Sequence, residues 1–224
     1  MRYFFDGKIE REEDNYIIRI PFNVWEVCKP DDVIKADILM DNRIIYCELI
    51  HEDKGNYYIP LSDADVADTD ISKVHKILLN ISVSLIKEDV TSPYSLENPI
   101  RKIDDIDIII QPIDGTCGQT VVAMLAGNTI AEVCTAMGCR EWQATMWRVI
   151  SALNYYGIDH SDIIVYTQGR EVTLPKCAVL MERMGRFCHY LLYFDGKYYD
   201  PNDGIMEEYD QTKLLGYLEI KLQD

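Results

Sequence analysis

The sequence predicts an α+β protein of two domains, a small N-terminal β-barrel and a C-terminal domain in which helices come first and an antiparallel sheet follows. The first ninety residues alternate apolar and polar side chains in short runs, and a polar, irregular stretch follows them. From about residue 118 the apolar residues recur at helical spacing, before short alternating runs return. The expected boundaries are 1–90 for the barrel, 91–107 for a linker and 108–224 for the second domain.

The N-terminal domain is expected to consist of short strands joined by tight turns. Asp41-Asn42 and Lys54-Gly55-Asn56 stand where hairpins close, and residues 24–28 form a short helical stretch. Regularly spaced short strands favour a small barrel. The strand segments are 3–9, 16–20, 33–40, 44–50, 57–59 and 77–86.

Three segments of this half, residues 20–24 (IPFNV), 44–47 (IIYC) and 57–61 (YYIPL), resemble a small bacterial β-barrel domain of unknown function. The resemblance spans residues 3–90 and implies a fold but no chemistry. His51 and His75 stand alone among charged or apolar neighbours, so we expect surface or core histidines rather than ligands.

The second domain is expected to begin with three helices, over residues 118–127, 130–137 and 141–156. Gly157 ends the third helix, and Asp195-Gly196 is a hairpin turn between two strands. The strand segments are 163–166, 178–182, 188–194, 197–199 and 217–222.

Composition limits the classes of function. Of 224 residues, 48% are hydrophobic, which is enough for a buried core, and 22 Lys and Arg stand against 38 Asp and Glu, a net charge of −16. A negative surface repels phosphate backbones and anionic lipids, so neither nucleic acid nor a membrane is an expected partner. The start of the chain lacks a signal peptide pattern, and the protein is expected to be cytoplasmic.

The seven cysteines are an odd number and lie mostly in apolar stretches, as expected of reduced thiols rather than a disulfide framework. Cys134 and Cys139 lack the neighbouring His and Cys ligands of a structural zinc site. No metal and no cofactor are expected.

Cys117 differs from the other cysteines in its surroundings. Gly115 and Thr116 precede it in a predicted turn, and Gly118 opens a helical pattern after it. The sulfur is therefore expected near a helix N-terminus, which favours the thiolate.

A thiolate nucleophile needs a base and a residue that orients the base, and His189 and Asp200 fit these roles. The strand that carries His189 turns at Asp195-Gly196 and returns, bringing Asp200 beside it. Asn202 or Asp203 are alternatives for the orienting residue. His160, in an expected exposed loop, is given no catalytic role.

Gln111 lies six residues before Cys117. Its side-chain amide is placed to donate to an oxyanion together with the backbone N–H of Cys117. Taken singly, each of the four residues also fits a structural role, as a packed thiol, a surface amide, a strand residue or a turn residue.

The segment QPIDGTCG, three helices, and then HYLLYFDGKYYDP resemble the papain-like superfamily, most closely the double-glycine leader peptidases and their stand-alone relatives, over residues 108–210. The resemblance implies that Gln111 lines the oxyanion hole, Cys117 is the nucleophile, His189 the catalytic histidine and Asp200 its partner. Those peptidases usually carry Asp directly before the cysteine, where this chain has Thr116, and are commonly joined to a membrane transporter. These departures argue against the processing of double-glycine leaders.

The function predicted from the sequence is hydrolysis of a peptide bond by a cysteine peptidase acting on a peptide or protein. An acyltransferase of the transglutaminase kind with the same nucleophile remains an alternative, as does a catalytically silent binding module. Cleavage specificity, set by loops such as residues 167–175, and the oligomeric state are not predicted.

Overall fold

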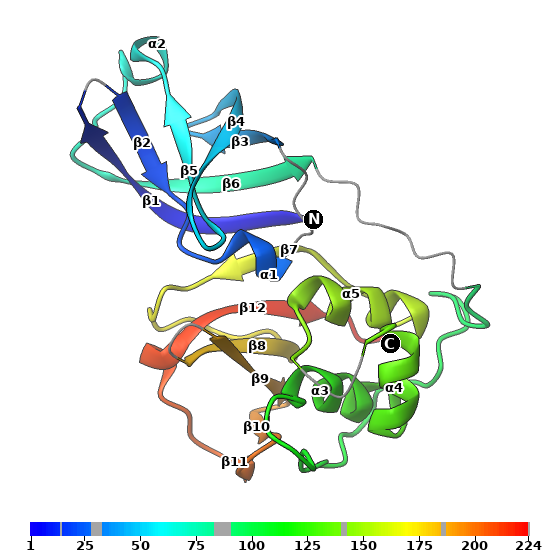
Figure 1. The fold of residues 1–224 in the computed structure, drawn as a ribbon. Helices are drawn as coiled ribbons and strands as arrows, with labels where there is room; N and C mark the ends of the chain where they lie inside the picture. The colour runs from blue at the N-terminus through cyan, green and yellow to red at the C-terminus, as the bar shows by residue number, and fades with distance from the viewer. Residues whose placement is uncertain (14, 28–32, 83–90, 140–142, 185–186, 224) are drawn as a thin grey trace. The chain divides into compact units, whose positions relative to one another are not determined.

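The computed structural model describes residues 1–224 except 14, 28–32, 83–90, 140–142, 185–186 and 224. The chain forms two compact units (Figure 1). Unit 1 comprises Met1–Ile86 and Asp162–Gln168, and unit 2 comprises Lys87–Ser161 and Gly169–Asp224. The end of the predicted strand 77–86, residues 83–86, and the last residue of the predicted helical stretch, Cys28, lie outside the described residues.

Unit 1 contains a closed barrel of six antiparallel strands, which confirms the predicted barrel. Going round it, β1 pairs with β2, then β5, β4, β3 and β6 follow, and β6 pairs again with β1. Two four-residue helices, α1 (Val24–Val27) and α2 (Asp63–Val66), lie between strands. The strands are β1 (Arg2–Glu12), β2 (Asn15–Arg19), β3 (Ile34–Met40), β4 (Arg43–Asp53), β5 (Asn56–Leu61) and β6 (Val74–Ser82).

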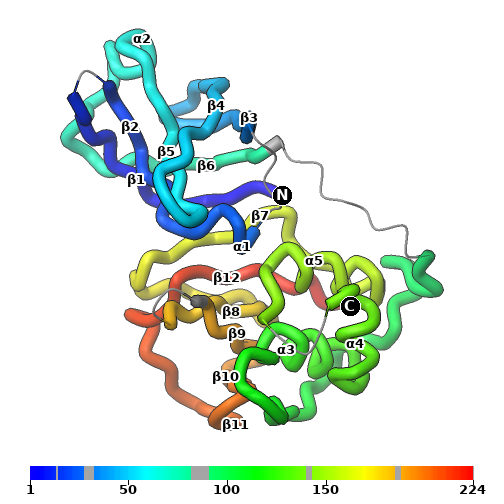
Figure 2. Tube along the Cα trace, in the orientation of Figure 1, coloured from blue at the N-terminus to red at the C-terminus, as the bar shows by residue number. Residues whose placement is uncertain are grey.

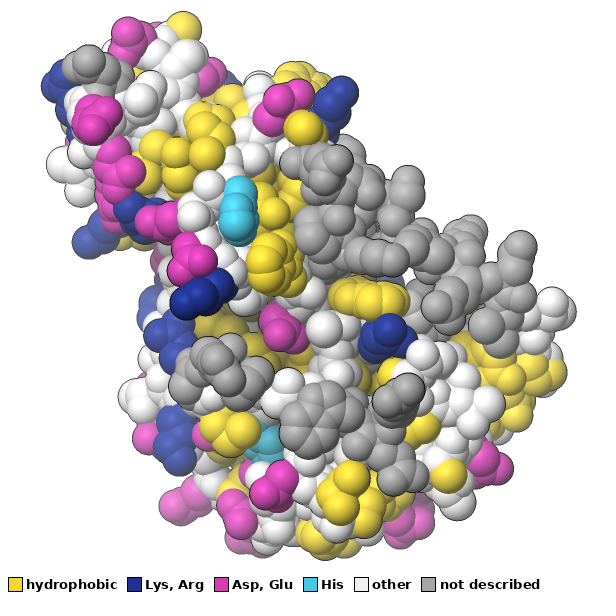
Figure 3. All heavy atoms as spheres, in the orientation of Figure 1, with side chains coloured by type: hydrophobic (Ala, Val, Ile, Leu, Met, Phe, Trp, Pro, Cys, Tyr) yellow, Lys and Arg dark blue, Asp and Glu magenta, His cyan; other side chains and the backbone are white. Residues whose placement is uncertain are grey.

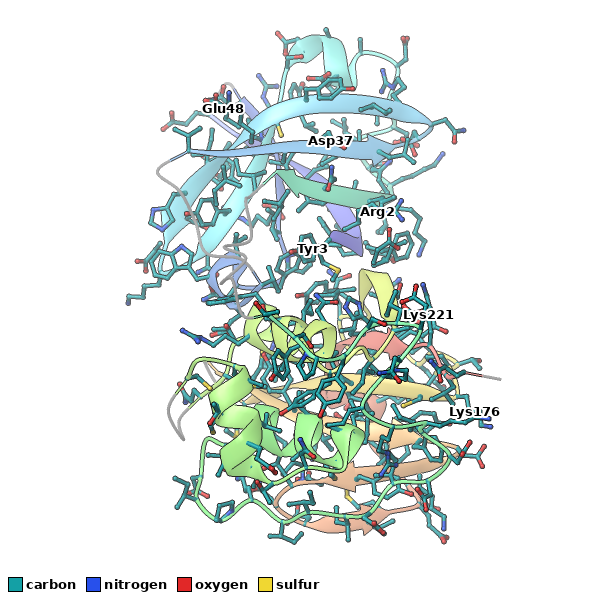
Figure 4. The ribbon with its side chains drawn as sticks, turned by 90° about the vertical axis from the view of Figure 1, so that its right-hand side faces the viewer. Arg2, Tyr3, Asp37, Glu48, Lys176 and Lys221 are labelled. Carbon is teal, nitrogen blue, oxygen red and sulfur yellow. The ribbon has the colours of Figure 1, made fainter. Side chains whose placement is uncertain are left out.

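The alternation in the sequence becomes the two sides of the barrel wall. Tyr3 of β1 is 2% exposed, and in β3 every second residue from Ile34 to Met40 is buried. Asp37 of β3 and Glu48 of β4 belong to the opposite set, which is partly or fully exposed (Figure 4). Burial of one face fixes the register of each strand.

The predicted hairpin turns are present. Asp41 and Asn42 have φ of 49° and 64°, and Lys54 and Gly55 have φ of 48° and 86°. Consecutive positive φ values match the twist of a two-residue antiparallel connection, and Asn, Asp and Gly adopt them at low cost.

A seventh strand, β7 (His160–Tyr166), joins unit 1 from far along the chain. It lies beside the start of β1 (Figure 2) and pairs with it in parallel. In this ladder Tyr3 is opposite Ile164. The first half of β1 thus has β6 on one edge and β7 on the other, whereas its second half pairs with β2.

Unit 2 holds the three longer helices, α3 (Cys117–Ala126), α4 (Ile130–Ala136) and α5 (Met146–Tyr155). The first two lie close to the predicted ranges, whereas α5 starts only after residues 143–145, which were predicted to be helical and are not. Gly127 and Gly157 adopt φ of 68° and 66° just after α3 and α5. Residues 91–116 contain no helix or strand, and Ile103 and Ile106 in this stretch are buried.

The sheet of unit 2 is antiparallel, in the order β11-β10-β9-β8-β12. Asp195 and Gly196 form the tight turn between β9 and β10, with φ of 47° and 88°. A cluster around Ala178, Leu180 and Leu191 forms the core on one face. The strands are β8 (Cys177–Met184), β9 (Phe187–Phe194), β10 (Lys197–Asp200), β11 (Gly204–Met206) and β12 (Leu214–Ile220), with a 3-10 turn, η1 (Gln211–Lys213), before the last.

The predicted fold class, α+β with helices first and an antiparallel sheet afterwards, is wrong. Strands hold 42% of the described residues, whereas two of the five α-helices in that part of the chain have only four residues. The strand that follows the helices, β7, pairs in parallel with β1. The alternation of apolar residues and the turn residues identify each strand by itself. They do not identify its partner, and the partner of β7 lies about 160 residues earlier in the chain.

Among the described residues, no helix is long and apolar enough to cross a membrane. The acidic side chains are spread over the face drawn in Figure 3 and do not gather into one patch.

Candidate active site

Cys117 is the first residue of α3 and is 7% exposed. The preceding Thr116 makes no side-chain capping bond, and its Oγ1 donates to the carbonyl of Ile113 at 2.8 Å. The first N–H groups of a helix lack partners within the helix and carry its positive partial charge. The sulfur of Cys117 therefore lies where a negative charge is stabilised.

Gly118 allows α3 to lie close to its neighbours. A Cβ atom at this position would be 3.0 Å from Cβ of Ala144, 3.3 Å from Cδ2 of Tyr190 and 3.4 Å from Cγ2 of Val149. Tyr190 follows His189 directly in β9, so this close approach brings the start of α3 to the start of that strand (Figure 1).

His189 and Asp200 are joined across the hairpin. The ladder pairs Tyr199 with Leu192, so Asp200 lies diagonally from His189, and the two side chains bridge the distance. Nε2 of His189 lies 2.9 Å from Oδ1 of Asp200, and both residues are buried, at 5% and 6% exposure. With Nε2 on the carboxylate, Nδ1 is the ring nitrogen left for Cys117.

The charges of the group follow from these contacts. Burial lowers the pKa of His189, but hydrogen bonds to Asp200 and Cys117 and the negative charge of these partners outweigh it, so the pKa rises to about 10. Burial raises the pKa of Asp200, but the bond with His189 and backbone N–H groups of residues 202 and 203 outweigh it and lower the pKa below its ordinary value. Near neutral pH the pair is an imidazolium and a carboxylate.

Gln111 is joined to the same turn. Its backbone N–H donates to the carbonyl of Pro201 at 2.8 Å, and its Nε2 donates to Oδ1 of Asn202. Asn202 in turn donates its backbone N–H to Oδ1 of Asp200 at 2.7 Å. The structure thus brings Cys117, His189 and Asp200 into one network and ties Gln111 to it through residues 201 and 202.

The two alternative orienting residues, Asn202 and Asp203, reach Asp200 through their backbone N–H groups. Nε2 of His189 contacts the Asp200 carboxylate. His160, which was given no catalytic role, contacts the carbonyl of Ser161 and the side chain of Asn154.

Glu182, which lies beside His189, and its partner Tyr209 were not identified from the sequence. Glu182 lies opposite His189 in the β8–β9 ladder, and its Oε2 accepts a hydrogen bond from the Tyr209 hydroxyl at 2.9 Å. Burial and this bond to a carboxylate raise the pKa of Tyr209 above its ordinary range. The pairing of Glu182 with His189 depends on the register of two strands, and the bond from Tyr209 depends on a loop, so no sequence motif marks either residue.

Other thiols have surroundings that favour the neutral form. Burial raises the pKa of Cys177 to about 12 and that of Cys47 to about 11, and it also raises the pKa of Cys139. Within the described part of the chain, no three His, Cys, Asp or Glu side chains are grouped as metal ligands.

The histidines of unit 1 have local partners. His75 lies 2.8 Å from Asp41 through Nδ1 and 3.0 Å from the carbonyl of Asp70 through Nε2. His51 stacks on Trp25 with ring centroids 5.7 Å apart. A cavity of about 630 Å³ on this unit is lined mainly by apolar side chains of β1, β3, β6 and β7, including Phe4, Leu39, Leu78 and Val165.

Comparisons with solved structures include a peptidase domain. No protein-family model and no curated protein matches the chain. The fold is similar to the peptidase domain of Streptococcus ComA, a bifunctional ABC transporter involved in quorum sensing, at 18% identity and a TM-score of 0.41, over 53% of this chain and 100% of that domain. A likeness of this size does not assign an activity, and we base the function on the geometry of the residues.

Proposed function

We propose that this protein is a cysteine peptidase that hydrolyses a peptide bond in a peptide or protein, with Cys117 as nucleophile. The observation that carries the proposal is the position of the His189 imidazole, whose Nε2 lies 2.9 Å from the Asp200 carboxylate and whose pKa is raised by both Asp200 and the neighbouring Cys117 side chain. A nucleophile, a base and an orienting carboxylate in contact are the parts of an activated thiol.

In the first half of the reaction the Cys117 thiolate attacks the carbonyl carbon of the substrate and forms a C–S bond. The oxyanion receives hydrogen bonds from the Cys117 backbone N–H and the Gln111 amide. The His189 imidazolium then gives its proton to the leaving amine as the C–N bond breaks, and a thioester remains.

In the second half, His189 accepts a proton from water as the water attacks the thioester. The C–S bond breaks, the acid product leaves, and the thiolate and imidazolium are restored. Asp200 keeps the imidazole oriented through both steps by its 2.9 Å contact with Nε2.

The first test is the rate of alkylation of each cysteine by iodoacetamide from pH 4 to 9, read by peptide mass spectrometry in the wild type and in His189→Ala. We expect Cys117 to react faster than the other six and to remain reactive at pH 5, and His189→Ala to slow it there about tenfold or more. Labelling of Cys117 at the rate of the other cysteines would refute an activated nucleophile.

Once substrates are found, the same thioester gives two distinguishable products. Water yields a free acid, whereas an added primary amine yields a new amide. Mass spectrometry of products formed with and without the amine therefore separates a peptidase from an acyltransferase.

A further inference from the structure

The turn that follows β10 holds two parts of the proposed site at once. Asp200 Oδ1 accepts from His189 Nε2 on one side and from the backbone N–H of Asn202 on the other. The next two residues hold Gln111, because the Pro201 carbonyl accepts its backbone N–H and the Asn202 Oδ1 accepts its Nε2–H.

The hydrogen bond from the Gln111 backbone N–H to the Pro201 carbonyl fixes the position of the Gln111 backbone. It does not determine the orientation of the side-chain amide. The terminal torsion of a glutamine has two broad minima that exchange the oxygen and the nitrogen. On the oxygen side, Oε1 of Gln111 is buried and has no hydrogen-bond partner among the described residues. The bond from Nε2 to Asn202 is therefore the contact that selects one orientation.

An amide nitrogen carries two hydrogens, and Asn202 uses one of them. The second N–H of the same nitrogen stays available as a donor. If the Gln111 amide turned over, Oε1 would take the place of Nε2 and face the side-chain oxygen Oδ1 of Asn202. Two acceptor oxygens would then repel each other, and no hydrogen bond would join them. A buried Oε1 without a partner costs free energy, and the bond at Nε2 offsets part of that cost.

We propose that Asn202 is a positioning residue of the proposed peptidase site, which orients the Gln111 amide so that Nε2 presents its second N–H to the oxyanion. The inference rests on the proposed function. In this role the Asn202 side chain acts through Gln111, whereas the backbone N–H of Asn202, which donates to Asp200, is kept when the side chain is shortened.

Two reagents separate this role from activation of the thiol. Alkylation by iodoacetamide needs the Cys117 thiolate but passes through no oxyanion. Acetylation by p-nitrophenyl acetate passes through one, because Sγ attacks the ester carbonyl, the acetyl group becomes a thioester and p-nitrophenolate leaves with its electron pair. Cys117→Ala supplies the background for both reactions, and mass spectrometry of the Cys117 peptide locates the adducts.

We expect Asn202→Ala to slow acetylation of Cys117 about tenfold and to leave its alkylation within about twofold of the wild type. Gln111→Ala, which removes the donor itself, should slow acetylation about 100-fold. In the Gln111→Ala background, Asn202→Ala should have no further effect, since the residue through which it acts is gone. Asn98→Ala, the same change at an exposed asparagine of unit 2, is the matched control.

Unchanged acetylation in Asn202→Ala would overturn the inference, as would two effects that multiply in the double variant. Equal slowing of both reagents would also overturn it, because that result places Asn202 in thiol activation through Asp200. Slow alkylation of Cys117 in the wild type would instead refute the proposed function. Thermal unfolding of each variant verifies that it is folded.

Discussion

At the scale of single residues, the properties of His189 are set by its partners rather than by its position in the sequence. Burial opposes the charged imidazolium, but the Asp200 carboxylate and Cys117 hold the proton on the ring and raise the pKa to about 10. The imidazole is therefore charged near neutral pH, as the proposed thiolate–imidazolium pair requires.

Replacing Asp200 by Asn tests this assignment directly. The variant keeps a side chain of the same shape but removes a negative charge that raises the His189 pKa, whereas the burial that lowers it remains. We expect the imidazole to lose its proton about 1 to 3 pH units lower than in the wild type. The measurement is an NMR titration of the His189 ring nitrogens.

Asp203→Asn is the matched control for that titration. Its side chain is exposed, and its contact with Asp200 is made by the backbone, so the midpoint for His189 should stay close to that of the wild type. A midpoint that moved equally in both variants would mean that general charge, and not the Asp200 contact, holds the proton.

At the scale of elements, the proposed site depends on how closely α3 approaches β9. All ten residues of α3 are buried, and Gly118 leaves no space between the helix and Ala144, Tyr190 and Val149. Tyr190 adjoins His189, so a shift of the helix would move Cys117 away from His189.

Gly118→Ala should therefore destabilise the protein by about 1 to 3 kcal/mol, because a Cβ would lie 3.0 Å from Cβ of Ala144. It should also slow alkylation of Cys117 at pH 5. Adding Ala144→Gly removes the closest atom and should restore part of both losses. Urea unfolding and iodoacetamide labelling measure them, and a single variant as stable and reactive as the wild type would contradict the close approach.

At the scale of the whole molecule, the chain returns to its own beginning. Residues 162–168 belong to the same compact unit as the barrel, and β7 covers the edge of β1 at residues 2–4. The edge of β1 at residues 2–4 therefore receives its parallel partner from a segment that follows the three longer helices in the sequence.

Ile164→Pro tests this pairing in the full chain. Ile164 is fully buried opposite Tyr3, and proline removes a backbone donor and does not fit inside a paired strand. Amide hydrogens of residues 2–4 should exchange about tenfold faster, while those of β4 and β5 keep their protection. Hydrogen–deuterium exchange read by mass spectrometry measures this, and unchanged exchange at residues 2–4 would show that β7 does not protect β1.

Some residues of the proposed site could be predicted from the sequence and others could not. Cys117 stands out because Gly115, Thr116 and Gly118 mark a turn followed by a helix, and His189 and Asp200 flank a recognisable Asp-Gly hairpin. Asn202 and Glu182 carry no such mark. Their positions depend on a bond to a residue 91 positions earlier and on the register of β8 against β9, and both arise from tertiary packing.

The sequence by itself determined the barrel of the first part, the three longer helices and the turns at Asp41-Asn42 and Asp195-Gly196, because periodicity and turn chemistry act over a few residues. Only the tertiary structure decided the fold class, the parallel pairing of β7 with β1 and the bond from Gln111 to Asn202. These features join segments far apart in the chain, and such contacts are selected by the packing of the whole molecule rather than by local preference.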